Sequence, residues 1–238
     1  MTEPVLFHVE NQVAVITLNR PERRNAINKA LLIRLYDCLE KVAREDAIRA
    51  AVITGNGKSF CSGLDLDIVQ TENLFNPRGD GSDLPDLFAA CSKPIIGAIN
   101  GHAITGGFEI ALNCDFLIAS AAASFADTHV RVGIHPGWGM TQLLQQAVGR
   151  RRARQMSFTC KFINAQTAYE WGLVNEVVPP ERLMPRAMEI AADICEGNPE
   201  MLRVVMDLIN FRDTAPLADS FAHERAGFAA FVKQHLPG

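Results

Sequence analysis

Long apolar segments are missing from this sequence of 238 residues. No apolar run approaches the roughly 20 residues that a helix needs to span a bilayer. Residues 1–11 also lack the basic and then apolar segments of a secretory signal. We therefore expect no membrane partner and a cytoplasmic location, with the matrix of an organelle as the alternative.

Cysteine pairs are missing as well. The six cysteines stand apart, without any Cys-x-x-Cys spacing, at positions 38, 61, 91, 114, 160 and 195. This distribution is typical of buried free thiols in a reducing compartment rather than of disulfides or a zinc site. His102 and His135 have no neighbours at metal-binding spacing. We therefore expect no metal and no cofactor.

The chain has no excess of positive charge. It carries 23 Lys and Arg against 27 Asp and Glu, a net charge of −4, so we expect no nucleic-acid partner. Gly57-Lys58-Ser59 resembles the end of a phosphate-binding loop, but that motif requires a glycine at position 52, where valine stands. The apolar and charged fractions, 48% and 21%, are those of an ordinary globular protein with a sizeable core.

Strand and helix patterns alternate over the first 180 residues. Strands are predicted at 12–18, 50–54, 94–99, 115–119, 124–126 and 173–178, and helices at 25–45, 105–114, 140–148, 151–158 and 165–171. Residues 70–86 are predicted to form a mobile loop. After Pro179-Pro180 the pattern is helical, at 181–195, 199–211 and 217–235. We predict an α/β region over 1–180 and a helical region over 181–238; the periodicity alone leaves ββα repeats and a doubly wound sheet both open.

Two glycine-containing turns carry the strongest chemical signal. Phe60–Asp65 follows one apolar strand and Asn100–Glu109 follows another, and each turn leads toward a helix. Glycines let the backbone come close to a ligand, and one N–H from each turn could hold a carbonyl oxygen as it becomes an oxyanion. Glu109 lies in the first turn of an apolar helix, where Thr105 is the predicted N-cap. The helix start lowers the pKa of such a carboxyl group and apolar surroundings raise it.

These turns resemble those of the crotonase family, the enoyl-CoA hydratases and isomerases. Further pieces of the family pattern occur in order at 18–21, 25–26, 114–115, 125–127, 133–137 and 172–175. The resemblance implies a spiral of ββα repeats, with C-terminal helices that form the contacts of a homotrimer or of a dimer of trimers. It also implies an acyl-CoA thioester as the small-molecule substrate. Relative to the family, a last helix rich in Lys and Arg is expected to be missing.

The resemblance assigns catalytic roles to particular residues. The N–H groups of Leu64 and Gly106 match the oxyanion donors, and Glu109 matches the glutamate that activates water. The family's second catalytic glutamate falls on His129, and histidine is a competent acid–base near neutral pH. Asp127 is expected to pair with His129 if both lie on one face of an extended segment.

Other positions are assigned to substrate binding by the same resemblance. Arg23 and Arg24 are implied near the nucleotide end of coenzyme A, Lys58 near its phosphates and Ser62 near its adenine, and the set is completed by Asp65 and Leu66. Trp138 stands where the family more often has a small residue. Its indole either narrows the acyl pocket or packs in the core.

Three functions remain open at this point. The first is an enoyl-CoA hydratase that adds water to a 2-enoyl-CoA. The second is another crotonase-type reaction, such as decarboxylation, hydrolysis or isomerisation; simple isomerisation is less favoured because His129 replaces its main base. The third is an acyl-CoA-binding protein without turnover.

Overall fold

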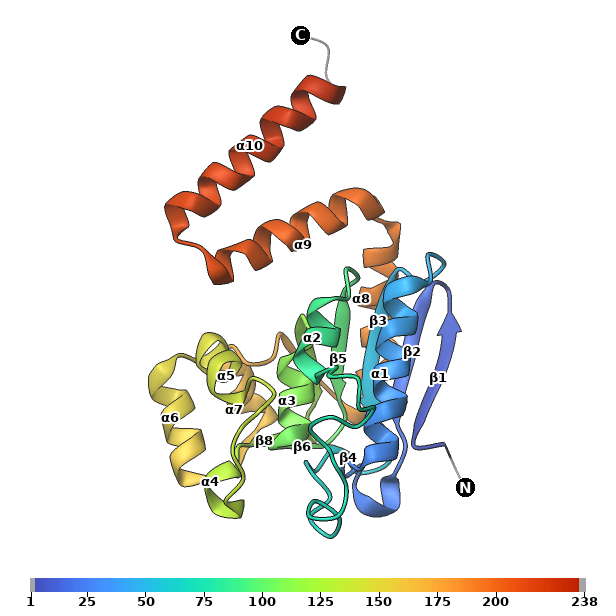
Figure 1. Cartoon of the computed structure of the whole chain (residues 1–238), viewed down its shortest axis with the longest axis vertical. Coiled ribbons are helices and arrows are strands. Elements are labelled where there is room, and N and C mark those ends of the chain that lie inside the picture. Colours follow the sequence, from blue (N-terminus) through green and yellow to red (C-terminus); the bar gives the residue numbers. More distant parts are fainter. Residues whose placement is uncertain (1–2, 236–238) are drawn as a thin grey trace. The chain divides into compact units, whose positions relative to one another are not determined.

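The computed structural model describes residues 3–235. The chain divides into two compact units, Met1–Cys195 and Glu196–Gly238, whose elements are labelled in Figure 1. The first unit contains both β-sheets and most of the helices. No helix in the described range combines the length and the apolar character that crossing a membrane would require.

The larger sheet of the first unit has six strands. Their order is β1 (Val5–Glu10), β2 (Val13–Leu18), β3 (Ala50–Gly55), β5 (Ile95–Ile99), β7 (Phe116–Ser120) and β10 (Glu176–Val178). Only the β1–β2 pair is antiparallel. Every residue of β5 is buried, as expected for a central parallel strand covered on both faces.

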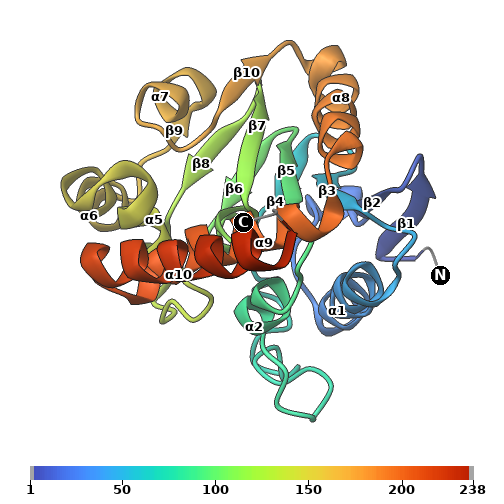
Figure 2. The ribbon, with the colours of Figure 1, turned by 90° about the horizontal axis from the view of Figure 1, so that it is seen from above.

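The smaller sheet has four short strands, in the order β4 (Ser59–Cys61), β6 (His102–Ile104), β8 (Ser124–Ala126) and β9 (Ile163–Asn164). The strands β3, β5 and β7 of the larger sheet are each followed by a strand of the smaller one. A helix then follows: α2 (Leu84–Ala89), α3 (Gly106–Leu112) or α4 (His129–Val132). Each repeat thus advances one place in both sheets (Figure 2), which confirms the ββα spiral over the doubly wound sheet.

Helices cover the larger sheet on both faces. On one side, α1 (Lys29–Arg44) buries its apolar stripe, which includes Leu31, Leu35 and Leu39, in the main core. On the other side, α8 (Leu183–Glu196) places Leu183, Ala187 and Ala191 against residues of β2, β3, β5 and β7. Because this four-residue spacing puts the three side chains on one face, α8 packs as part of the first unit. That unit therefore extends past the expected boundary at residues 180 and 181.

The remaining helices of the first unit follow the third repeat. They are α5 (Met140–Val148), α6 (Arg150–Thr159) and α7 (Ala165–Glu170), and short 3-10 turns occupy Pro21–Arg23 and Pro180–Arg182. Residues 62–83 contain no regular helix or strand, so the predicted loop is confirmed over 70–83, and its last three residues begin α2.

The second unit is a pair of helices, α9 (Pro199–Thr214) and α10 (Leu217–His235). The rings of Phe211 and His223 stack between them, with centroids 4.3 Å apart. No described residue of either helix is buried, although many are apolar. The exposed apolar side chains include those of Val204, Val205, Ile209, Phe221, Phe228 and Phe231.

Candidate active site

The two glycine-containing turns meet at the backbone. A Cβ atom built on Gly63 would lie 2.9 Å from the carbonyl oxygen of Ile104 and 3.5 Å from the amide nitrogen of Gly106. Gly63 also has a φ of +90°, which side-chain-bearing residues rarely adopt. A side chain at position 63 would therefore push the turns apart, so glycine is required there.

Leu64 and Gly106 both line one cavity. Gly106 is the first residue of α3, and N–H groups at this position have no partner within a helix. On the other turn, Gly63 and Asp65 form backbone hydrogen bonds with Ile27, of 2.8 and 2.9 Å. Because backbone groups alternate in direction along an extended segment, the intervening N–H of Leu64 faces away from Ile27.

Thr105 joins the start of α3 to the segment that carries His129. Its hydroxyl lies 2.5 Å from the hydroxyl of Thr128 and accepts a hydrogen bond of 3.1 Å from the Thr128 amide. The prediction that Thr105 caps the helix is wrong for its side chain, which makes no capping hydrogen bond. Its unusual φ of +52° turns the hydroxyl toward Thr128 instead.

Glu109 is buried, with 2% of its surface exposed. Its Oε1 accepts hydrogen bonds from the amides of Trp138 (2.9 Å) and Met140 (3.2 Å). Burial raises the pKa of Glu109, and these hydrogen bonds and the nearby His129 offset the rise only in part. Its Oε2 lies 3.7 Å from Nε2 of His129.

His129 is the first residue of α4 and is also buried. Its Nδ1 lies 2.7 Å from Oδ1 of Asp127, and the same oxygen accepts the His129 amide at 3.1 Å. The expected pairing of Asp127 with His129 is therefore present. The expected extended segment is wrong, because the chain turns into α4 at His129 and the turn brings the two side chains together.

The cavity beside Glu109 and His129 is small. Its volume is about 10 Å³, which is room for about one water molecule. Trp138 both packs in the main core and forms a wall of this cavity, so neither earlier interpretation excludes the other. Its ring approaches to 3.4 Å from a Cβ built on Gly106. Phe75, a residue of the irregular loop that the sequence did not single out, faces Trp138 with ring centroids 6.4 Å apart.

The residues assigned to coenzyme A divide into two groups. In the first, Arg23 pairs with Asp65 at 3.1 Å and with Asp67, while the Ser62 amide bonds to the Arg24 carbonyl at 3.1 Å. The structure thus brings Arg23, Arg24, Ser62 and Asp65 together. Because both carboxylate oxygens of Asp65 contact arginines, its side chain holds those arginines in place.

The second group consists of two exposed residues. Lys58 lies in the turn between β3 and β4, and Leu66 follows Asp65 with 56% of its surface exposed. Neither is brought into the buried cavity beside Glu109. Both are therefore positioned for contacts outside it.

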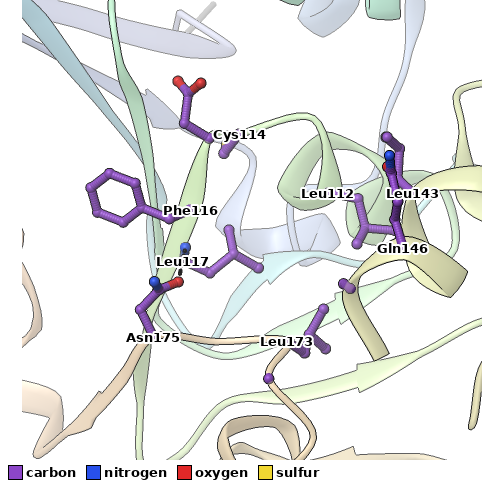
Figure 3. A pocket seen from close by; sticks show the side chains of 11 residues that line it. Leu112, Cys114, Phe116, Leu117, Leu143, Gln146, Leu173 and Asn175 are labelled. Carbon is purple, nitrogen blue, oxygen red and sulfur yellow. Dashed lines mark hydrogen bonds between the residues drawn. The ribbon is translucent and has the colours of Figure 1, made fainter. Parts of the chain in front are cut away.

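A much larger hollow lies at the other end of α3. It has a volume of about 270 Å³ and is lined by Leu112, Leu117, Leu173 and Asn175, among others (Figure 3). It contains none of the residues predicted for the site. No group of three metal-ligating side chains occurs here or elsewhere within residues 3–235.

Comparisons with known proteins place the chain among related sequences. A family profile described as enoyl-CoA hydratase/isomerase matches residues 8–236. The crotonyl-CoA hydratase of Syntrophomonas wolfei is 40% identical over 196 residues, which cover 81% of this chain and 75% of that protein. A probable peroxisomal enoyl-CoA hydratase of Arabidopsis thaliana is 38% identical over 198 residues, covering 83% and 75%.

A solved structure gives the same result for the fold. An enoyl-CoA hydratase from Geobacillus kaustophilus superimposes with a TM-score of 0.87 at 31% identity, covering all of this chain and 98% of that one. The match extends over both units of the chain and agrees with the ββα repeats. The chain therefore belongs to the enoyl-CoA hydratase/isomerase family, the crotonase superfamily.

Proposed function

We propose that this protein is an enoyl-CoA hydratase, which adds water across the double bond of a 2-enoyl-CoA thioester. One observation carries the proposal: a buried Glu109–His129 pair lines the same cavity as Leu64 and Gly106, the residues whose amides we assign as the oxyanion donors. An acid–base pair beside two convergent N–H donors is suited to adding water to a conjugated thioester. The relatives named as hydratases support the same reaction.

The two amides act on the thioester oxygen. As water attacks the β-carbon, the π electrons of the double bond move toward the carbonyl, and negative charge develops on its oxygen. Fixed N–H donors stabilise that charge without having to reorient. The lack of a side chain at Gly63, where a Cβ would lie 3.5 Å from the Gly106 amide nitrogen, lets the two turns lie close together.

Glu109 and His129 divide the proton transfers. Glu109 takes a proton from water while the water oxygen bonds to the β-carbon, and a protonated His129 gives its Nε2 proton to the α-carbon. The proton on Glu109 then returns to His129, whose Nε2 lies 3.7 Å from Oε2. The raised pKa of Glu109 makes its carboxylate a better base near neutral pH.

We assign the rest of the coenzyme A moiety to the surface beside the glycine-containing turn Phe60–Asp65. Lys58 supplies positive charge for its phosphates, since phosphate binding by lysine is common, and Arg23 and Arg24 lie near the nucleotide end. Ser62 supplies a contact near the adenine, and Leu66 belongs to the same binding set. Asp65 contributes by holding Arg20 and Arg23 in place.

A second candidate is another reaction of acyl-CoA enolates, such as decarboxylation, hydrolysis or isomerisation. It is favoured by the presence of only one glutamate in the cavity lining, with His129 where the family pattern has a second. A binding protein without turnover is the third candidate. It is consistent with the small volume of the cavity.

One assay separates these candidates. Purified protein is mixed with straight-chain 2-enoyl-CoA substrates of increasing length, and loss of the conjugated thioester absorbance is followed, with the product identified by mass spectrometry. A 3-hydroxyacyl-CoA product supports hydration. Tight acyl-CoA binding by calorimetry without any product would favour the binding protein. Release of free coenzyme A, or a 3-enoyl-CoA product, would favour the second candidate, and a substrate that carries a free carboxyl group, such as a malonyl-type CoA thioester, tests its decarboxylation branch by loss of CO₂.

We further propose that the protein assembles as a homotrimer, or as a dimer of trimers, through α9 and α10. The exposed apolar side chains of these helices support this, since such a face is normally covered. Light scattering on the purified chain tests it.

We also propose a cytoplasmic location. The six free thiols fit a reducing compartment such as the cytoplasm.

A further inference from the structure

A polar chain, buried except for the half-buried Ser157, connects three helices of the first unit. Ser157 of α6 bonds to Asp127, Asp127 bonds to His129 at the start of α4, and His129 faces Glu109 of α3. We propose that Asp127 is a positioning residue that holds His129 in the tautomer protonated on Nδ1, so that Nε2 faces Glu109 and the cavity. The use of Nε2 in catalysis rests on the proposed function, whereas the tautomer does not.

The geometry fixes the direction of the hydrogen bond. Oδ1 of Asp127 lies 2.7 Å from Nδ1 of His129 and also receives the His129 amide at 3.1 Å. An ionised carboxylate can only accept hydrogen bonds, so Nδ1 must carry the proton. In the neutral imidazole the lone pair is then on Nε2. This is the atom that lies 3.7 Å from Oε2 of Glu109.

The surroundings keep Asp127 ionised. Burial would raise its pKa, but hydrogen bonds from His129 and Ser157 outweigh burial and hold that pKa below its usual range. The other titratable groups around the cavity are Glu109 and His135. Arg131, on the same helix as His129, is directed to the carbonyl of Cys160. His129 is thus flanked by two carboxyl groups, that of Asp127 beside Nδ1 and that of Glu109 beside Nε2.

Asp127 acts through His129 rather than on the substrate. It is 2% exposed and is absent from the cavity lining, which includes His129 and Glu109. The Asp127 carboxylate therefore contacts Nδ1 of His129, whereas Nε2 faces the cavity. In the proposed reaction, it stabilises the positive charge of the protonated ring before that ring gives its proton to the substrate. If Asp127 merely held the start of α4 through the His129 amide, its loss would lower stability and leave the tautomer unchanged.

The test is ¹⁵N NMR of the full chain labelled at histidine, with His129→Gln used to assign the signals of His129. In the native protein we expect the neutral form of His129 to be the Nδ1–H tautomer. In Asp127→Asn we expect the Nε2–H tautomer to become populated, because a neutral amide oxygen is a weaker acceptor for the Nδ1 proton than a carboxylate. We also expect kcat to fall at least about tenfold with KM nearly unchanged. Asp127→Glu should restore part of both effects.

A matched control is Asp115→Asn. Its carboxylate also accepts a backbone N–H, that of Ile95 at 2.6 Å, and Asp115 lines the hollow at the other end of α3. It should leave the His129 tautomer unchanged. A folded Asp127→Asn protein that keeps the native tautomer would overturn the proposal.

Two further arms keep the test decisive. If Asp127→Asn does not fold, the native protein still decides the tautomer, and a neutral His129 that carries its proton on Nε2 would overturn the proposal. If no substrate is hydrated, the NMR result still decides the tautomer. Failure of the proposed function and failure of this inference are therefore distinguishable.

Discussion

A hollow lies at each end of helix α3, and the two hollows differ in volume and in the residues that line them. At the N-terminal end, Glu109 and His129 border a cavity of about 10 Å³. At the C-terminal end, Leu112 and Leu117 line a hollow of about 270 Å³. Leu64 and Gly106 also line the smaller cavity, and none of these four predicted site residues lines the larger one.

The two hollows also differ in the hydrogen-bond partners of their acidic side chains, Asp115 and Glu109. Asp115, at the larger hollow, accepts a hydrogen bond from the amide of Ile95. Glu109 accepts hydrogen bonds from two amides with one carboxylate oxygen, and its other oxygen faces an imidazole nitrogen of His129. A fixed carboxylate with a titratable neighbour can exchange protons, so chemistry is expected at the small cavity.

The largest expected effect comes from Glu109→Gln. Glutamine keeps the shape and can still accept the Trp138 and Met140 amides, but it cannot take a proton from water. We expect kcat for hydration to fall by about 10² to 10⁴. Stopped-flow absorbance gives kcat, and calorimetry should show acyl-CoA affinity within about threefold of the native value. A loss of less than about tenfold would mean that the reaction centre lies elsewhere.

Gly63→Ala tests the geometry of the two amides. The added Cβ would lie 2.9 Å from the Ile104 carbonyl and would displace the turn that carries Leu64. We expect kcat to fall by about 10 to 10². The matched control is Gly79→Ala, where φ is +78° but nothing lies within 4 Å. It shares the backbone strain without the contact, so equal losses in both variants would attribute the effect to strain alone.

Acid should weaken the reaction at a pH above that of an ordinary glutamate. Glu109 must be ionised to act as base, and burial raises its pKa, so its protonated form persists to higher pH. We expect kcat/KM to fall about tenfold per pH unit on the acid side of that pKa. A profile that stays flat down to the pKa of a solvated carboxyl group would contradict the assigned role of Glu109.

The amides and Glu109 could be predicted because each belongs to a motif that is local in sequence. Leu64 follows Gly63 directly, and Glu109 follows Gly106 within one helical turn. Strands such as β3 and β5 have five or more consecutive buried residues, which makes them readable as apolar runs.

The rest depends on contacts that a local pattern does not contain. The strands β4 and β6 have three residues each, too few to show a period of two. Phe75 lies in an irregular loop, and only the fold brings it to Trp138. The hydroxyl of Thr105 suits an N-cap by residue type, but its partner Thr128 is 23 residues away.

Trp138→Phe should change substrate preference more than rate. The smaller ring still fills most of the core site but leaves space beside Gly106, where the indole now approaches. We expect the ratio of kcat/KM for a medium-length over a short 2-enoyl-CoA to rise about fivefold, in the range that pocket volume typically provides. An unchanged ratio would show that Trp138 is only a core residue.

The smallest effect is expected at the large hollow. Asn175→Ala removes a side chain whose oxygen accepts the Leu117 amide at 3.4 Å, a long hydrogen bond, and it leaves Glu109, His129 and both glycine turns untouched. We expect hydration to stay within about twofold of the native rate, while the free energy of unfolding falls by about 1 kcal/mol or less. Urea denaturation and the absorbance assay measure the two quantities on the same preparation. A loss of activity larger than the loss of stability explains would show that the two ends of α3 are coupled, and the contrast between them would then describe one site rather than two.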